Sequence, residues 1–296
     1  MGTSTHNRGQ KGGTPLVPSW LDQPDTNPQN ENESDDNGSQ IPPVGDADRF
    51  RTPRGEFTRY INSGGRDRSL GRKSVSNYVR NSLGGSSNAT QRMGSARNSS
   101  AKLLNVAGVF ASGGARAVEQ YLSIGNLSHK TASEAFVAIT DFICPDGGPQ
   151  DEGIARSAYI SAIEESPEMA TIRFEDLTSE QIMVIVERTM ANAIFNRITN
   201  DIGNKIILLP QDRTISDGLI VQMKDFVKGA VSDALISLNI RAGNIRQGDS
   251  LKIVDQVYKA AFDIMVSAGE NECLVHNKNT QSCRGDSSKL QREFPQ

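Results

Sequence analysis

The sequence predicts an all-α protein, in which an antiparallel helical domain of about six helices follows a long disordered N-terminal region. Two observations carry this prediction. From about residue 103 to residue 269, apolar residues recur every three or four positions, as they do on the buried face of an amphipathic helix. Before residue 103 the chain is rich in Gly, Ser, Asn and charged residues, so it offers little apolar surface to offset the entropy of ordering.

Charge divides the chain into blocks of different character. Residues 22–48 contain eight acids and no Lys or Arg, residues 49–102 contain twelve Lys or Arg and two acids, and residues 103–296 have an excess of acids. Together with the helical pattern, these blocks predict five segments. They are an N-terminal docking or modification peptide (1–22), an acidic disordered linker (23–48), a basic, mostly disordered region (49–102), an all-α helical domain (103–269) and a polar C-terminal tail (270–296).

Helix start and stop signals support the helical domain. Thr131 with Glu134, and Thr178 with Gln181, have the spacing of capping boxes, and Gly113-Gly114 predicts a kink or break in the first helix. Gly269 is expected to close the last helix. Within the basic region, residues 74–83 could form a short helix, with Val75, Tyr78, Val79 and Leu83 on one side. Residues 171–174 and 206–209 could be strands but are too few for a sheet.

Several functional classes are disfavoured by absent motifs. The chain has no apolar run long enough to cross a membrane, no apolar core of a signal peptide and no phosphate-binding Gly-rich loop. Its three cysteines include no CxxC pair, which fits reduced thiols. We therefore expect a cytoplasmic, non-enzymatic protein with no cofactor and no metal.

Two residue groups resemble catalytic or metal sites but have simpler interpretations. Gly248-Asp249-Ser250-Leu251 matches the block that holds the nucleophile in one esterase class, but Ser250 stands at an expected helix start, where capping explains it. Cys273, His276 and Cys283 could be imagined as zinc ligands, yet three donors in a polar tail make a weak site.

The basic region is a candidate nucleic-acid interface, because its cations could neutralise several phosphates. Its alternative interpretation is a solvated linker whose charge complements the acidic segment, and the sequence does not separate the two. The candidate phosphate-contacting residues are Arg49, Arg51, Arg54, Arg59, Arg66, Arg68, Arg72 and Lys73.

The first 22 residues have the features of a ligand peptide. Pro15 and Pro18 favour an extended backbone, so that the only Trp of the chain, Trp20, could anchor the peptide in a groove of a partner or on the protein's own helical domain. Gly2 follows the initiator Met, whose removal would leave an unbranched amine. The chain has His6 where a myristoylation motif requires Ser or Thr, so we expect Gly2 to accept a different group.

The residues Met1-Gly2-Thr3-Ser4, followed by Gly12-Gly13-Thr14-Pro15-Leu16-Val17-Pro18-Ser19-Trp20, resemble the opening of the QatB family of the bacterial Qat antiphage system. The resemblance implies a non-enzymatic component encoded beside a P-loop ATPase (QatA), a QueC-like enzyme (QatC) and a TatD-like nuclease (QatD). QueC-like enzymes activate the carboxylate of a 7-deazaguanine, so by analogy Gly2 would be acylated by the deazapurine. The resemblance assigns partner binding to Thr3, Ser4, Gly12, Gly13, Thr14, Pro15, Leu16, Val17, Pro18, Trp20 and Leu21.

Overall fold

The computed structural model describes residues 48–144, 150–203, 213–246 and 248–286, and all statements on the fold refer to these residues. Within them the chain forms ten α-helices and no named β-strand, so the expected all-α class is confirmed. An isolated antiparallel bridge joins Thr131 to Arg173, where a strand was considered. The expected disordered region lies, up to residue 47, outside the described residues.

The helices follow one another along the described chain with short connections. Their bounds are α1 (Arg51–Asn62), α2 (Arg68–Asn77), α3 (Ser86–Gln91), α4 (Ser95–Leu122), α5 (Ala132–Ala138), α6 (Thr140–Ile143), α7 (Gln150–Glu164), α8 (Ser179–Ile202), α9 (Arg213–Ser237) and α10 (Ser250–Asp286). A π-helical turn, Tyr78–Ser82, continues α2. Residues 103–269 of the described chain contain α4 to α10, seven helices where about six were expected, because the segment after the Thr131 capping box is divided into the two short helices α5 and α6.

Both capping boxes are confirmed. The Thr131 hydroxyl accepts from the Glu134 amide at 3.2 Å, and the Thr131 amide donates to the Glu134 carboxylate at 3.0 Å. Thr178 and Gln181 make the equivalent pair at 3.2 and 2.9 Å. Each box satisfies two backbone donors that a helix start would leave unpaired. The expected kink in α4 is also present, because Gly113 and Gly114 have non-helical backbone angles, with φ of +66° at Gly114.

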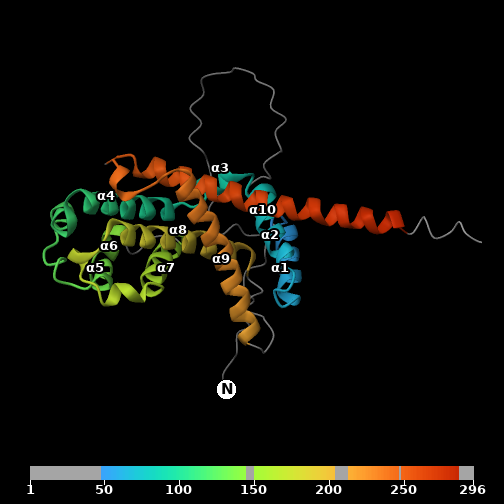
Figure 1. Cartoon of the computed structure of the whole chain (residues 1–296), viewed down its shortest axis with the longest axis horizontal. Coiled ribbons are helices and arrows are strands. Elements are labelled where there is room, and N and C mark those ends of the chain that lie inside the picture. The colour runs from blue at the N-terminus through green and yellow to red at the C-terminus, as the bar shows by residue number, and fades with distance from the viewer. Residues whose placement is uncertain (1–47, 145–149, 204–212, 247, 287–296) are drawn as a thin grey trace, which may run out of the picture.

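The longer helices form one body with a shared core. Helix α8 packs against α4, α7 and α9, and α10 packs against α4, α9 and α2. Figure 1 shows α4 and α8 running beside each other, with α1 and α2 at the end of the body where α10 leaves it. Three buried aromatic rings, Phe110, Phe136 and Phe174, meet edge to face at centroid distances of 5.4 and 5.8 Å. Such contacts fix the helices relative to one another.

The basic region, residues 49–102, was expected to be mostly disordered, and the structure differs from that expectation. It forms α1, α2, the π-helical turn, α3 and the start of α4, and Phe57, Tyr60, Val75 and Tyr78 are buried in the common core. The physical reason is that its few apolar residues have helical spacing and pack on α8 and α10, which composition does not reveal. The four residues expected on one side of the 74–83 helix are all buried.

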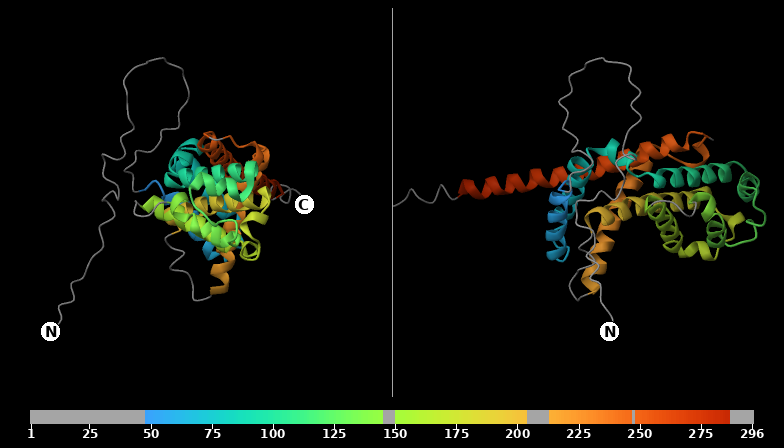
Figure 2. Two further views of the ribbon diagram at one scale, coloured as in Figure 1. Left: turned by 90° about the vertical axis from the view of Figure 1, so that its left-hand side faces the viewer. Right: turned by 180° about the vertical axis from the view of Figure 1, so that it is seen from behind.

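Helix α10 does not end at Gly269 as expected but continues to Asp286, and it extends beyond the rest of the body in Figures 1 and 2. Gly269 instead permits a close crossing of α2. A Cβ atom at this position would lie 2.4 Å from Ser76 Cβ and 2.9 Å from the Arg72 carbonyl oxygen. The glycine is therefore explained by helix packing and not by a helix end.

Candidate functional site

The predicted N-terminal site lies outside the described residues. Gly2 and the eleven expected partner-binding residues, Thr3 to Leu21, fall within residues 1–47. Their roles remain predictions from the sequence. The structure does place the other predicted site, the basic residues of 49–73, and it reveals two hollows that sequence reasoning missed.

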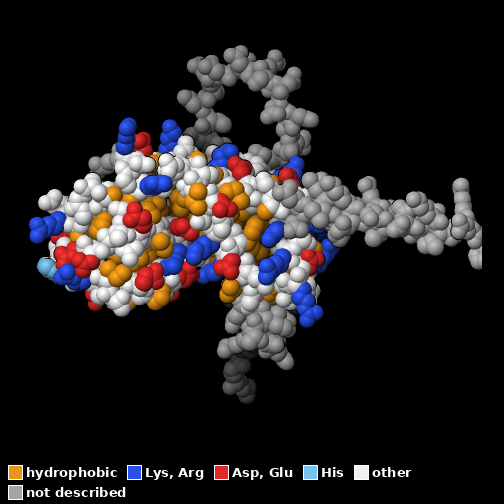
Figure 3. Space-filling view, in the orientation of Figure 1, with side chains coloured by type: hydrophobic (Ala, Val, Ile, Leu, Met, Phe, Trp, Pro, Cys, Tyr) orange, Lys and Arg blue, Asp and Glu red, His pale blue; other side chains and the backbone are white. Residues whose placement is uncertain are grey.

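The eight basic residues of the candidate nucleic-acid interface divide into two groups. Four side chains are exposed on or beside α1 and α2, and four are partly buried. The exposed residues are Arg51, Arg59, Arg66 and Arg68, and the partly buried residues are Arg49, Arg54, Arg72 and Lys73. In Figure 3, Lys and Arg side chains gather over the end of the body that α1 and α2 form.

Among the partly buried arginines, Arg54, Arg49 and Arg72 have structural contacts. Arg54 donates from Nε and Nη2 to the Asp201 carbonyl oxygen at 3.0 and 2.8 Å, which satisfies a free acceptor at the C-terminal end of α8. The guanidinium carbon of Arg49 lies 4.6 Å from the centre of the Phe50 ring, and that of Arg72 lies 5.9 Å from the centre of the Phe226 ring. Burial, followed by the nearby charge of Arg92, lowers the pKa of Arg49.

Three of the four remaining cations of the basic region bind the acidic part of the chain. Arg97 forms two short hydrogen bonds with Asp255 of α10, Arg80 pairs with Glu270 of α10, and the Lys102 ammonium donates to the Phe142 carbonyl oxygen at 2.9 Å. The charge segregation seen in the sequence therefore corresponds in part to an interface within the body. The linker interpretation had assigned this complementarity to residues 22–48 alone.

A partly buried polar network around Asp201 joins the π-helical turn to α7 and α8. The Tyr78 hydroxyl donates to Asp201 Oδ2 at 2.7 Å, and Arg197 lies between Asp201 and Asp151. Burial raises the pKa of Tyr78 well above its usual value, and the neighbouring Asp201 carboxylate adds to this effect. Because every member holds helices together, the network is a structural one. The four-residue spacing of Arg197 and Asp201 on one helix was its only signal in the sequence.

A hollow of about 280 Å³ lies between α2 and α9 beside Tyr60 of α1. Arg68 and Arg72, one turn apart on α2, both line it, and Phe226 of α9 forms another part of its wall. The Tyr60 hydroxyl donates to Gln222 Oε1 at 3.2 Å across the same place. Two arginines of the candidate nucleic-acid interface, Arg68 and Arg72, thus line the same small hollow.

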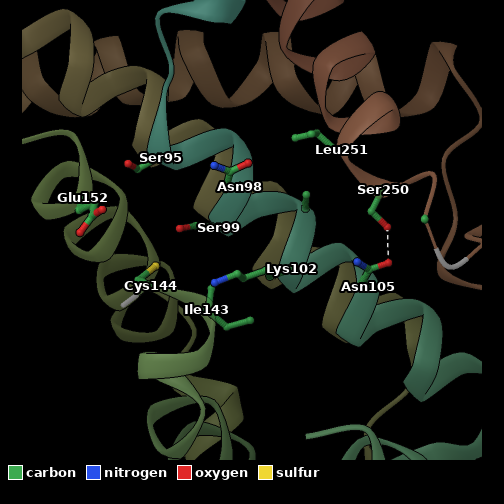
Figure 4. A pocket seen from close by; sticks show the side chains of 12 residues that line it. Ser95, Asn98, Ser99, Lys102, Asn105, Ile143, Cys144, Glu152, Ser250 and Leu251 are labelled. Carbon is green, nitrogen blue, oxygen red and sulfur yellow. Dashed lines mark hydrogen bonds between the residues drawn. The ribbon is translucent and has the colours of Figure 1, made fainter. Parts of the chain in front are cut away.

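A second hollow, of about 370 Å³, lies between α4, the end of α6, the start of α7 and the start of α10 (Figure 4). One face of α4 supplies polar side chains at helical spacing, among them Ser95, Asn98, Lys102 and Asn105. Glu152 of α7 contributes a carboxylate to the opposite wall. Figure 4 shows the Lys102 and Asn105 side chains directed to different neighbours, and Asn105 Oδ1 accepts from the Ser250 hydroxyl at 2.5 Å.

Two groups in this hollow that could act as nucleophiles, Ser250 and Cys144, are held in unreactive states. The Ser250 side chain is buried and its hydroxyl is donated to an amide oxygen, with no base in that bond. The Cys144 thiol is also buried, and burial raises its pKa, which reduces the thiolate that would react. The geometry supports a structural role for Ser250, but as a contact with Asn105 of α4 and not as the helix cap that was expected.

The remaining sequence hypotheses concern metals and membranes. The side chains of Cys273, His276 and Cys283 lie outside the part of α10 whose side chains the structure describes. Among the described residues, His, Cys, Asp and Glu side chains form no group of three or more that could hold a metal ion. In the same residues, we find no helix with the length and apolar character to span a membrane.

The fold defines an all-α protein. The polar contacts described above, in the two hollows and in the network around Asp201, mainly join one helix to another. Comparison with known families identifies the chain further. The family model described as "Qat anti-phage system associated protein QatB" matches residues 84–265, which is more than half of the chain. The chain belongs to this family and is a component of the Qat antiphage defence system, whose other components are its partners. No curated protein and no solved structure matches the chain.

The matched residues begin at Gly84 and so exclude both the N-terminal peptide and helices α1 and α2. The resemblance noted from the first 22 residues and the family match thus rest on different parts of the chain and agree. The matched part contains the second hollow and most of the network around Asp201, whereas the exposed arginines of the candidate nucleic-acid interface lie outside it.

Proposed function

We propose that the protein is a non-enzymatic, cytoplasmic scaffold of the Qat system, whose N-terminal Gly2 is conjugated to a 7-deazaguanine by a QueC-like partner, QatC. The family match carries the proposal, because it makes the other Qat components the partners of this chain. The geometry supports a scaffold, since Ser250 and Lys102 in the larger hollow bind Asn105 and a backbone carbonyl. We further propose contacts with the ATPase QatA and with the nuclease QatD.

The chemistry of Gly2 supports its role as the acceptor. A QueC-like enzyme delivers an amine to an activated carboxylate, and a glycine amine is unbranched and can take the place of ammonia as the nucleophile. The following residues, Thr3 and Ser4, are small, and Gly12 and Gly13 precede the proline-containing peptide. A narrow active site could therefore admit the N-terminus while residues 14–21 dock on the enzyme.

The test is intact and N-terminal-peptide mass spectrometry of the protein produced with and without its Qat partners. We expect an adduct on Gly2 only when the QueC-like partner is active. Gly2→Ala keeps an amine but adds a methyl branch, and it should lower the yield of the adduct. Gly9→Ala, in the same peptide, is the matched control and should leave the yield unchanged. An unmodified Gly2 in the presence of all partners would exclude the conjugation part of the proposal.

A second candidate function is nucleic-acid binding, which the exposed positions of Arg51, Arg59, Arg66 and Arg68 favour. Each cation that contacts a phosphate steepens the dependence of affinity on salt. Replacing Arg59 and Arg66 by Gln should therefore weaken binding of a single-stranded DNA probe and reduce its salt slope by about 1.4, whereas Arg54→Gln, which removes a structural contact, should act mainly on stability. An affinity that is unchanged in the Arg59/Arg66 variant would exclude this function for α1 and α2.

A further inference from the structure

The exposed and partly exposed positions of α1, α2 and the turn between them carry an excess of positive charge, and we call these positions together the basic face. It consists of the exposed Arg51, Arg59, Arg66 and Arg68 with the partly exposed Lys73. Two carboxylates lie within the same stretch, and both are held by hydrogen bonds: Glu56 accepts from the Asn77 amide at 2.9 and 2.8 Å, and Asp67 accepts from Ser69. Positive charge on this face therefore exceeds negative charge.

Other cations of the basic region bind acidic or carbonyl partners within the body. Arg54 binds the end of α8, Arg97 binds Asp255, and Arg80 binds Glu270. These contacts use part of the positive charge of residues 49–102. The part that remains is gathered on the exposed sides of α1 and α2, where it can interact with a further acidic group.

The segment directly before α1 has the opposite charge. Residues 22–48 contain eight Asp or Glu and no Lys or Arg, and the structure describes the chain only from the last of these acids, Asp48. A segment joined to the surface that it binds has an effective concentration on the order of millimolar. Its 27 residues can extend roughly 90 Å, far more than the roughly 18 Å length of the twelve-residue α1, so reach does not limit docking.

We propose that this acidic segment, residues 22–48, docks in cis on the basic face of α1 and α2. The hollow beside Tyr60 supplies a defined place for a carboxylate, because the exposed Arg68 lines it from α2. Asp225 is the one carboxylate among the residues that line this hollow, so cationic groups outnumber it there. The docked segment covers the arginines that a nucleic acid would contact, and it thereby weakens binding of other polyanions. The proposal does not depend on conjugation at Gly2.

Zero-length crosslinking of the full-length protein tests this docking. A carbodiimide joins a carboxylate to a nearby lysine ammonium as an amide with loss of water, and Lys73 is the lysine of the basic face. We expect crosslinks from residues 22–48 to Lys73 in 50 mM salt, and a loss of at least about fivefold in 1 M salt, where the Debye length falls to about 3 Å. Lys130, exposed in the connection before α5, is the internal control and should give few such crosslinks.

Two triple variants separate docking on this face from nonspecific attraction. Arg59→Gln, Arg66→Gln and Arg68→Gln together should reduce the Lys73 crosslinks several-fold, and they should not increase the crosslinks to any other lysine. The matched control removes the same charge from exposed sites elsewhere, Arg116, Arg241 and Arg246, and should leave the Lys73 crosslinks unchanged. Circular dichroism of each variant shows whether the helices are retained.

Mixing protein labelled with ¹⁵N and unlabelled protein distinguishes crosslinks within one molecule from crosslinks between two. The proposal is overturned if the Lys73 crosslinks join different molecules, if they are no more frequent than those to Lys130, or if the variant of the basic face keeps them while its helices are intact. A variant in which Glu31, Glu33, Asp35 and Asp36 become amides should lose the crosslinks and bind a single-stranded DNA probe more tightly than the unaltered protein.

Discussion

Arg97 of α4 and Asp255 of α10 form a bidentate ion pair, with Nε 2.6 Å from Oδ1 and Nη2 2.5 Å from Oδ2. The two residues lie 158 positions apart in the sequence and belong to blocks of opposite net charge. The hydrogen bonds to Asp255 raise the pKa of Arg97. The pair shows in one contact how the basic N-terminal helices are joined to the acidic remainder of the body.

We expect Arg97→Ala and Asp255→Ala each to lower the free energy of unfolding by about 1 to 2 kcal/mol, because the pair is partly shielded from water and bidentate. A double-mutant cycle followed by urea denaturation should give a coupling of about 1 kcal/mol. Arg97→Lys should not restore it, since an ammonium cannot form the same two bonds. The exposed pair Lys259–Asp263 on α10 is the control, and coupling at Arg97–Asp255 no larger than there would contradict the prediction.

The sequence predicted the local structure well where a side chain acts on its own backbone. Thr131, Thr178 and the glycine pair of α4 each have the role that their neighbours in sequence indicate. The same reasoning was wrong for residues 49–102, since Tyr78 is buried through a partner, Asp201, that lies 123 positions away. The composition of a segment does not reveal contacts with residues far away in the sequence. A polar segment with a few well-placed apolar residues was therefore predicted to be disordered.

The candidate sites were predictable only in part, for the same reason. The sequence could identify the arginines of α1 and α2 but not which of them are used internally, because Arg54 binds a backbone carbonyl of α8. The hollow around Lys102 had no sequence signal, since its walls come from four separate helices. Ser250 stands at the start of α10 as expected, but its hydroxyl donates to Asn105 of another helix and is not shown in the capping bond that was predicted.

Gly269 on α10 should be one of the least replaceable residues of the body. We expect Gly269→Val to lower the free energy of unfolding by about 2 kcal/mol or more, because the new atoms would overlap Ser76 and the Arg72 carbonyl oxygen. Gly229→Ala on α9 is the control, since a Cβ there meets nothing within 4 Å. That change should stabilise the protein by about 0.5 to 1 kcal/mol through helix propensity. Equal effects of the two changes in thermal unfolding would contradict the close crossing of α2 and α10.

Buried tyrosines should limit stability at alkaline pH. Burial raises the pKa of Tyr78, Tyr159 and Tyr258 above the value of about 10 that an exposed tyrosine has. The folded state thus favours their neutral form, so the stability that they contribute is complete below pH 10 and is lost as the pH rises above it. Absorbance at 295 nm and circular dichroism, recorded together from pH 8 to 12, should show these tyrosines ionising as the helices unfold.

Tyr159→Phe provides the control for this pH dependence. It removes a titrating group together with the hydrogen bond to the Phe136 carbonyl oxygen at 2.7 Å. The variant should be less stable at pH 7 by about 1 kcal/mol, and its stability should fall less steeply above pH 10. Ionisation of all the tyrosines near pH 10 with the helices intact would contradict the burial of these hydroxyl groups.

Substitution of Ser250 distinguishes a scaffold from a hydrolase. If its hydroxyl serves only to bind Asn105, Ser250→Ala should lower the free energy of unfolding by about 1 kcal/mol and leave protection against phage intact. Asn105→Ala removes the same bond from the other side and is the matched control, so the two variants should behave alike in both assays. A nucleophile would break this symmetry, because protection would be lost in the Ser250 variant, at unchanged stability, and kept in the Asn105 variant. Plaque assays with the complete Qat system, combined with thermal unfolding of each purified variant, decide between the two roles.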